Sequence, residues 1–228
     1  MSAHSFLDQL LKTGAGVFAD AQAATGRARA SGDLQKYASG AAVGGVLALL
    51  LGTRRGRSLG GSALKLGSVA AIGALAWKAY QDYQAGQRGA AAGTANAGAA
   101  PRFEALPEPE LEQHSRAMLK AMIAAAKSDG HMDDRERELV HVELTRTGAD
   151  AATQTWVEAE LKRPIDPAEV AAAATTPEMA AEVYLASLLM ADETTTMERA
   201  YLDELARQLN LAPGLKSDLE ARAQAQRG

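Results

Sequence analysis

A repeated pattern of helix, acidic turn and helix is the feature that most constrains this chain. Its two copies read SDGHMDDRERELV over residues 128–140 and ADETTTMERAYL over residues 191–202. Each copy has an Asp where one helical pattern ends, then a capping residue, a Glu three positions after that cap, and an Arg directly after the Glu. Because each copy predicts two helices joined by a tight turn, the pair predicts a helical bundle.

Helix boundaries can be predicted throughout residues 105–228. Apolar spacing predicts a helix over 107–127, and a second from about Asp134 to Thr147 that stops at Gly148. Further helices are predicted to start after the capping residues Asp150, Asp166, Thr176 and Thr195. The chain is 47% hydrophobic but only 4% aromatic, and much of the apolar content is Ala, which favours helix. We therefore predict an all-α fold.

Composition divides the 228 residues into four regions. We predict a partly disordered N-terminal segment (1–39), a Gly-rich apolar membrane-associated region (40–84), a flexible linker (85–104) and a helical domain (105–228). The first 104 residues carry 11 Lys and Arg against 5 Asp and Glu, whereas the remainder carries 13 against 23. A basic, Gly-rich segment of this kind favours contact with anionic lipid. It lacks the aromatic residues that interleave with basic ones in nucleic-acid modules, so no nucleic acid is predicted.

Two apolar stretches support the membrane interpretation of residues 40–84. Gly40–Gly52 is too short to cross a bilayer, and Leu59–Trp77 is nearly long enough but contains Lys65. Gly and Ala residues at four-residue spacing would allow close helix packing in lipid, or self-association of the chain. The alternative is a set of Gly- and Ala-rich helices that pack on one another or on the acidic domain.

Five carboxylates in the two acidic turns form a candidate cation site. They are Asp129, Asp133, Glu136, Asp192 and Glu198. Several carboxylate oxygens suit a hard divalent cation, Mg²⁺ or Ca²⁺ rather than Zn²⁺. The alternative is that these groups only cap helices, since the loop lacks the ligand order of an EF-hand.

The sequence predicts no enzyme. There are 0 cysteines, which excludes thiol nucleophiles and thiolate metal sites, and no nucleotide-binding or hydrolase motif is present. Carboxylates at helix starts stay ionised because of the helix dipole, which opposes a general-acid role. Glu138 and His141 have the Glu-x-x-His spacing of di-iron bundles, but a second copy is missing, so a solvated helix face is expected.

The runs AAAKSDGHMDDRERE and MADETTTMERAYLDELA, preceded by a Gly-rich segment with an Arg cluster, resemble one known family. It is the family of the inner membrane protein YebE, whose C-terminal part is a TerB-like (tellurite-resistance) domain. The resemblance covers most of the chain from about Gly40 onward. It implies a TerB-like bundle, association with the inner (cytoplasmic) membrane, a divalent-cation site in the two turns and no assigned enzymatic reaction.

These expectations together describe a membrane-attached, non-enzymatic binding module. Its ligand would be a divalent cation or a partner protein, in an envelope or metal and oxyanion stress response. The alternative is a structural helical adaptor whose acidic turns serve only as caps; a metal-dependent hydrolase is a third, weaker alternative.

Overall fold

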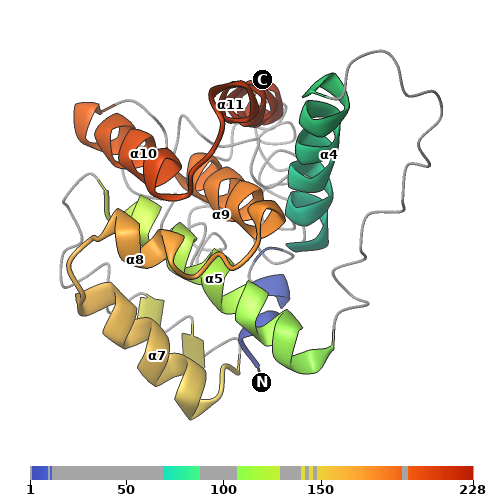
Figure 1. The fold of residues 1–228 in the computed structure, drawn as a ribbon. Coiled ribbons are helices and arrows are strands. Elements are labelled where there is room, and N and C mark those ends of the chain that lie inside the picture. The colour runs from blue at the N-terminus through green and yellow to red at the C-terminus, as the bar shows by residue number, and fades with distance from the viewer. Residues whose placement is uncertain are drawn as a thin grey trace, which may run out of the picture.

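The computed structural model describes residues 2–9, 11, 69–87, 107–128, 140–141, 144–145, 148–191 and 195–227. All regular structure in these ranges is helical, which confirms the predicted all-α class (Figure 1). The helices are α4 (Val69–Gln87), α5 (Glu108–Ala126), α7 (Ala151–Lys162), α8 (Pro167–Ala171), α9 (Pro177–Met190), α10 (Thr196–Gln208) and α11 (Pro213–Arg227). Residues 3–9 and 11, called the N-terminal helix below, are also helical, as are residues 140–141 and 144–145.

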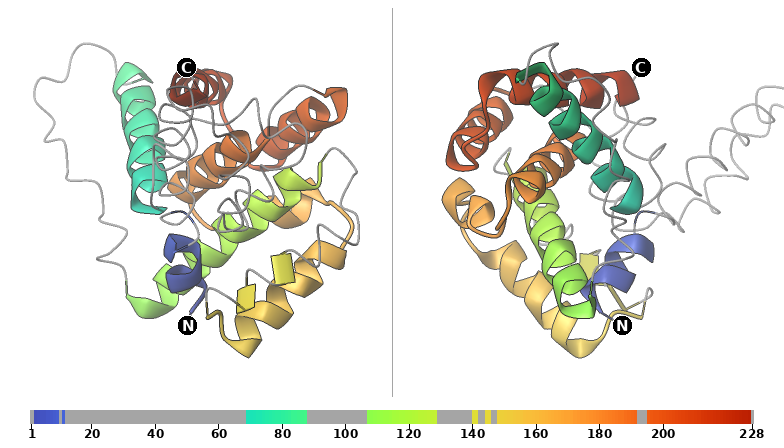
Figure 2. Two further views of the ribbon diagram at one scale, coloured as in Figure 1. Left: turned by 180° about the vertical axis from the view of Figure 1, so that it is seen from behind. Right: turned by 45° about the vertical axis from the view of Figure 1, so that its right-hand side comes forward.

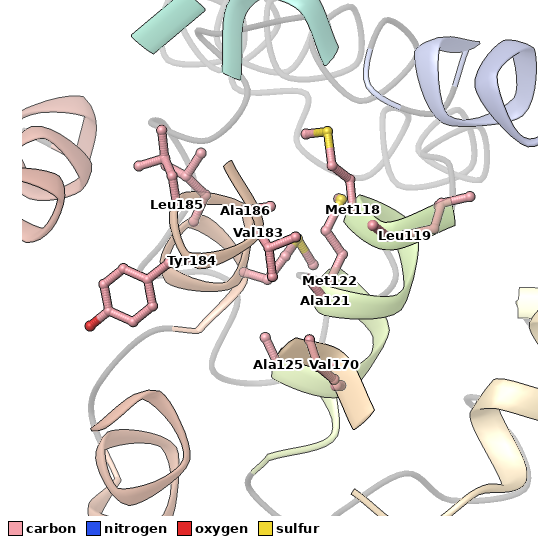
Figure 3. Packing of buried hydrophobic residues seen from close by; sticks show 14 of the residues in the cluster. Met118, Leu119, Ala121, Met122, Ala125, Val170, Val183, Tyr184, Leu185 and Ala186 are labelled. Carbon is pink, nitrogen blue, oxygen red and sulfur yellow. The ribbon is translucent and has the colours of Figure 1, made fainter. Parts of the chain in front are cut away.

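Helix α9 forms the centre of the molecule. It contacts α4, α5, α10 and α11, and its buried residues lie on every side of the helix. A helix that is apolar all round can only be stable when neighbours surround it. Figure 3 shows Met118 and Met122 of α5 facing Val183 and Ala186 of α9, with Tyr184 on another side of α9. The core is therefore built around a helix that the sequence predicted by its cap rather than by an amphipathic period.

The predicted helix starts are confirmed at four positions. In each, the capping side chain accepts a hydrogen bond from a backbone N–H of the first turn, which would otherwise lack a partner. The bonds run from Thr153 N to Asp150 Oδ1 (2.7 Å), from Ala168 N to Asp166 Oδ1 (2.9 Å), from Met179 N to Thr176 Oγ1 (3.2 Å) and from Glu198 N to Thr195 Oγ1 (3.1 Å).

Two helix ends use a left-handed residue. Gly148 has φ 69°, and the hydrogen bonds from Gly148 N to Thr145 O and from Ala149 N to Leu144 O form a Schellman motif. This confirms Gly148 as a helix stop. Asn210, with φ 53°, ends α10 in the same way, with a bond from Leu211 N to Ala206 O.

Helix α11 was not predicted from the sequence. It begins at Pro213, directly after the turn at Asn210, and buries Leu215, Leu219 and Ala223 at four-residue spacing. Pro at the first helical position and that spacing are both visible in the sequence. The helix packs on α9 and α4.

Helix α4 packs on the rest of the protein. Ile72, Ala76 and Ala79 are buried against the core, and Arg222 Nη2 of α11 donates to Asp82 Oδ2 of α4 at 2.7 Å. For residues 69–84 this is the packing that the alternative interpretation of the apolar region predicted. Among the helices that the structure describes, none is long and apolar enough to cross a membrane. Residues 40–68, which include most of both apolar stretches, lie outside the described ranges.

The N-terminal helix also packs on the bundle, although the sequence placed it in a separate segment. Phe6, Leu7 and Leu11 are buried in the common core. Figure 2 shows the N-terminal helix, in blue, against the first turns of α5. The physical reason is its apolar face, which finds a partner on the bundle rather than in solvent.

Candidate functional site

The structure describes one of the five predicted cation ligands. Asp129, Asp133, Glu136 and Asp192 lie outside the described residues, whereas Glu198 lies in the first turn of α10. Whether the five carboxylates share a cation therefore stays a prediction. The described residues nearest to the turns are Ser128 and Val140 for the first and Ala191 and Thr195 for the second.

Glu198 forms a capping box with Thr195. Its Oε2 accepts hydrogen bonds from Thr195 N at 3.0 Å and from Thr195 Oγ1 at 2.9 Å, while Glu198 N donates to Thr195 Oγ1. The residue is 7% exposed. A carboxylate with two internal donors on one oxygen is held firmly, and that oxygen has little capacity left for a cation.

The helix ends that border the two acidic turns lie on the same side of the bundle. Helix α5 ends just before Asp129, with Ser128 buried and its Oγ donating to Ala125 O at 2.6 Å. Helix α10 begins just after Asp192. Figure 1 shows the end of α5 and the start of α10 both toward the left of the molecule, and α10 contacts α5. The described parts of the chain thus place the C-terminal end of α5 and the N-terminal end of α10 on one side of the molecule.

No group of three or more His, Asp and Glu residues suited to a metal ion occurs within the described ranges. His141, which the sequence placed on a solvated helix face, is exposed and lies with its Nδ1 2.7 Å from Glu158 Oε1 on α7. Its partner is therefore an acidic side chain of a neighbouring helix.

A groove lies between α5, α7 and the end of α8, and the sequence did not predict it. Its volume is about 410 Å³, within the range of ligand pockets in proteins. Its apolar lining is formed by Pro109, Ala117, Trp156, Ala172 and Ala173. Of these, only Trp156 is large, and its indole is the main apolar surface that a ligand would meet.

Charged residues surround this apolar lining. Arg116 lies over the Trp156 ring, with its Cζ 5.7 Å from the ring centroid, and its Nε donates to Glu112 Oε1 at 3.0 Å. Lys120, one turn further along α5, lies 3.6 Å from Glu169 Oε2. Glu160 is 8% exposed and pairs with Arg163 at 3.4 Å. In the sequence, the only sign of this arrangement is Trp156. Its role depends on the packing of α5 on α7, which the sequence does not predict.

Glu112 also joins the groove to the N-terminal helix. Its Oε1 and Oε2 accept hydrogen bonds from Ala3 N at 3.1 Å and His4 N at 3.3 Å. Burial alone would raise the pKa of Glu112, but the hydrogen bonds from Arg116, Ala3 and His4 outweigh it and hold the pKa below its usual range. An ionised carboxylate on α5 thus caps a helix from a distant part of the chain.

The comparisons with known proteins give a family but no activity. A family model described as "Protein of unknown function (DUF533)" matches residues 36–223. A protein from Yersinia enterocolitica, described as "Uncharacterized protein in ampR 5'region", is 27% identical over 110 residues, which cover 48% of this chain and 79% of that protein. No solved structure matches the chain.

Proposed function

We propose that this chain, which belongs to the DUF533 family, is a non-enzymatic, TerB-like helical module that binds a divalent cation through its two acidic turns. The observation that carries the proposal is that the end of α5 and the start of α10 lie on the same side of the bundle and that these helices are in contact. Carboxylates from two neighbouring turns, with main-chain carbonyls and water, supply the oxygen ligands that Mg²⁺ and Ca²⁺ prefer.

A structural adaptor is the second candidate, and the Glu198 capping box favours it. Both internal donors to Glu198 Oε2 come from Thr195, so this carboxylate already has a structural role. In an adaptor, all five carboxylates would serve as caps, and the acidic surface would bind a basic partner protein.

Membrane attachment completes the proposal. Because α4 is packed on α9 and α11, the part of the region 40–84 left for lipid is 40–68. We propose that these residues hold the module at the inner membrane, where it would take part in an envelope or metal and oxyanion stress response. Carbonate extraction of membranes tests the attachment: release of the chain into the supernatant would contradict a spanning segment.

Thermal unfolding of the purified full chain with Mg²⁺, Ca²⁺, Mn²⁺ or Zn²⁺ tests the cation site. An ion at 100 times its Kd stabilises the folded state by about 2.7 kcal/mol, which for a chain of this size raises Tm by roughly 5–10 °C. We expect this rise with one of the ions, and its loss in Asp129→Asn. Glu110→Gln, which removes an exposed carboxylate on α5, should keep the rise.

The two candidates give different results in this assay. No change in Tm with any of the four ions would end the cation proposal and leave the adaptor. In that case Asp133→Ala should still lower Tm, by the same amount with and without ions. A rise that survives Asp129→Asn would place the ion elsewhere.

A further inference from the structure

The groove between α5, α7 and α8 offers more hydrogen-bond donors than it uses. The Nε of Arg116 donates a hydrogen bond to Glu112, and its guanidinium lies over the Trp156 ring. Among the described residues, its two terminal Nη groups donate no hydrogen bond, and its side chain is 42% exposed. A guanidinium fixed in this way presents a planar pair of donors that matches a carboxylate.

Lys120 adds a second donor on the same face of α5. Its Nζ is 3.6 Å from Glu169 Oε2, beyond hydrogen-bond distance, and it donates to no other residue within the described ranges. The side chain of Lys120 is 19% exposed. Since residues 116 and 120 are about one helical turn apart, their backbone positions are separated by about 6 Å along α5.

The carboxylates of the groove, in contrast, are already occupied. Glu112 accepts from two backbone N–H groups and from Arg116, and Glu160 faces Arg163. A cationic ligand would have to displace these donors. An anionic ligand would instead meet the Nη groups of Arg116 and the ammonium of Lys120, which among the described residues is held only by its 3.6 Å ion pair with Glu169. The excess of acidic residues in 105–228 opposes an anionic ligand only weakly at this groove, because salt screens charges that lie more than about 8 Å away.

We propose that this groove binds an extended acidic peptide segment of a partner protein. In an extended strand, residues two positions apart face the same way and lie about 7 Å apart, close to the separation of residues 116 and 120 on α5. Two carboxylates at alternate positions would meet Arg116 and Lys120. The side chain between them points to the opposite side of the strand, toward α7, where an apolar residue would cover Trp156. Trp and Arg are among the residues that most often dominate interface affinity.

The proposal names the partner class for the binding module described above and rests on that non-enzymatic role. Its test is separate from the cation test, because the groove lies between α5, α7 and α8 and its donors belong to residues outside the acidic turns. Loss of the cation effect would leave peptide binding unchanged, and loss of peptide binding would leave the cation effect unchanged.

The experiment is an NMR titration of the full chain with two matched peptides. The chain has 2 Trp, so Trp77→Phe assigns the indole N–H resonance of Trp156. The probe is acetyl-Leu-Glu-Leu-Glu-amide, and its control is the same peptide with Gln in place of Glu. We expect the Glu peptide to shift the Trp156 resonance in a saturable manner, with a Kd about tenfold lower than that of the Gln peptide.

Variants identify the donors. Arg116→Gln should lower the affinity for the Glu peptide to that for the Gln peptide. Lys120→Gln should lower it in part, and this second variant keeps the test valid if the first folds poorly. Lys162→Gln, an exposed position of α7 outside the groove lining, should change nothing.

Three results would overturn the proposal. The first is no shift with either peptide, and the second is equal affinity for the two. The third is an equal shift with the same concentration of inorganic phosphate, which would make the groove a general anion site.

Discussion

Glu112→Gln is expected to loosen the N-terminal helix from the bundle. The wild-type carboxylate accepts from Ala3 N, His4 N and Arg116 Nε, so both of its oxygens face donors. Gln keeps the shape of the side chain but replaces one acceptor oxygen with an NH₂ group. That group would face an N–H, and the attraction of the negative charge to the helix N-terminus would be lost.

The expected loss is roughly 1.5 kcal/mol. A carboxylate that caps a helix N-terminus contributes about 1 kcal/mol, and an Arg–Glu pair one turn apart on a helix about 0.3–0.5 kcal/mol. The side chain of Glu112 is 27% exposed, so these values need little reduction for solvent screening. A loss of this size corresponds to about a tenfold fall in the protection of residues 3–9 against local opening.

Hydrogen exchange of the full chain, followed by mass spectrometry, measures this opening directly. Peptides that cover residues 3–9 should exchange about ten times faster in Glu112→Gln than in the wild type at pH 7. The difference should depend on pH because the pKa of Glu112 is lowered in the folded state. The stabilisation is fully present above the unfolded-state pKa of about 4.3, and it is lost as pH falls through the lower folded-state value.

Glu110→Gln is the matched control, since Glu110 is an exposed carboxylate in the same turn of α5. It should leave exchange of residues 3–9 unchanged. Equal exchange rates in Glu112→Gln and the wild type at pH 7 would refute the reasoning. The buried faces of Phe6 and Leu7 would then hold the helix without the cap.

Three further substitutions test the packing and the helix ends. Ile72→Ala in α4, at a position 2% exposed, should cost about 2–5 kcal/mol in urea unfolding; no change would mean that α4 is not part of the folded bundle. Gly148→Ala should cost roughly 1 kcal/mol, because Ala is strained at φ 69° although its Cβ would meet no atom within 4 Å; an unchanged unfolding midpoint would contradict the Schellman motif. Thr195→Ala should cost about 1 kcal/mol by thermal unfolding, equally with and without Mg²⁺, and a loss seen only with Mg²⁺ would show that the turn acts through the ion.

The helix starts could be predicted because their signals are local. A capping side chain such as Asp150 or Thr195 bonds to an N–H only three residues away, so the sequence contains both partners in one short window. The stop at Gly148 is local for the same reason, since it depends on the φ of one residue. Both boundaries could therefore be read without knowledge of the fold.

The groove could not be predicted because its parts are distant in sequence. Arg116 and Trp156 are brought together only when α5 packs on α7, and Glu112 reaches Ala3 across more than 100 residues. The docking of α4 also depends on the bundle, because its buried Ile72 and Ala76 give the same apolar pattern whether the neighbour is lipid or protein. Composition decides that these faces will be covered, whereas tertiary packing decides what covers them.

Lys127 links the groove to the first acidic turn. Its Nζ donates to Glu160 O at 2.9 Å and to Arg163 O at 2.6 Å, so it satisfies carbonyls at the end of α7. Glu160 lines the groove, and Asp129 follows Lys127 by two residues. The hydrogen bonds of Lys127 therefore tie the C-terminal end of α7 to the stretch of chain that precedes the first acidic turn.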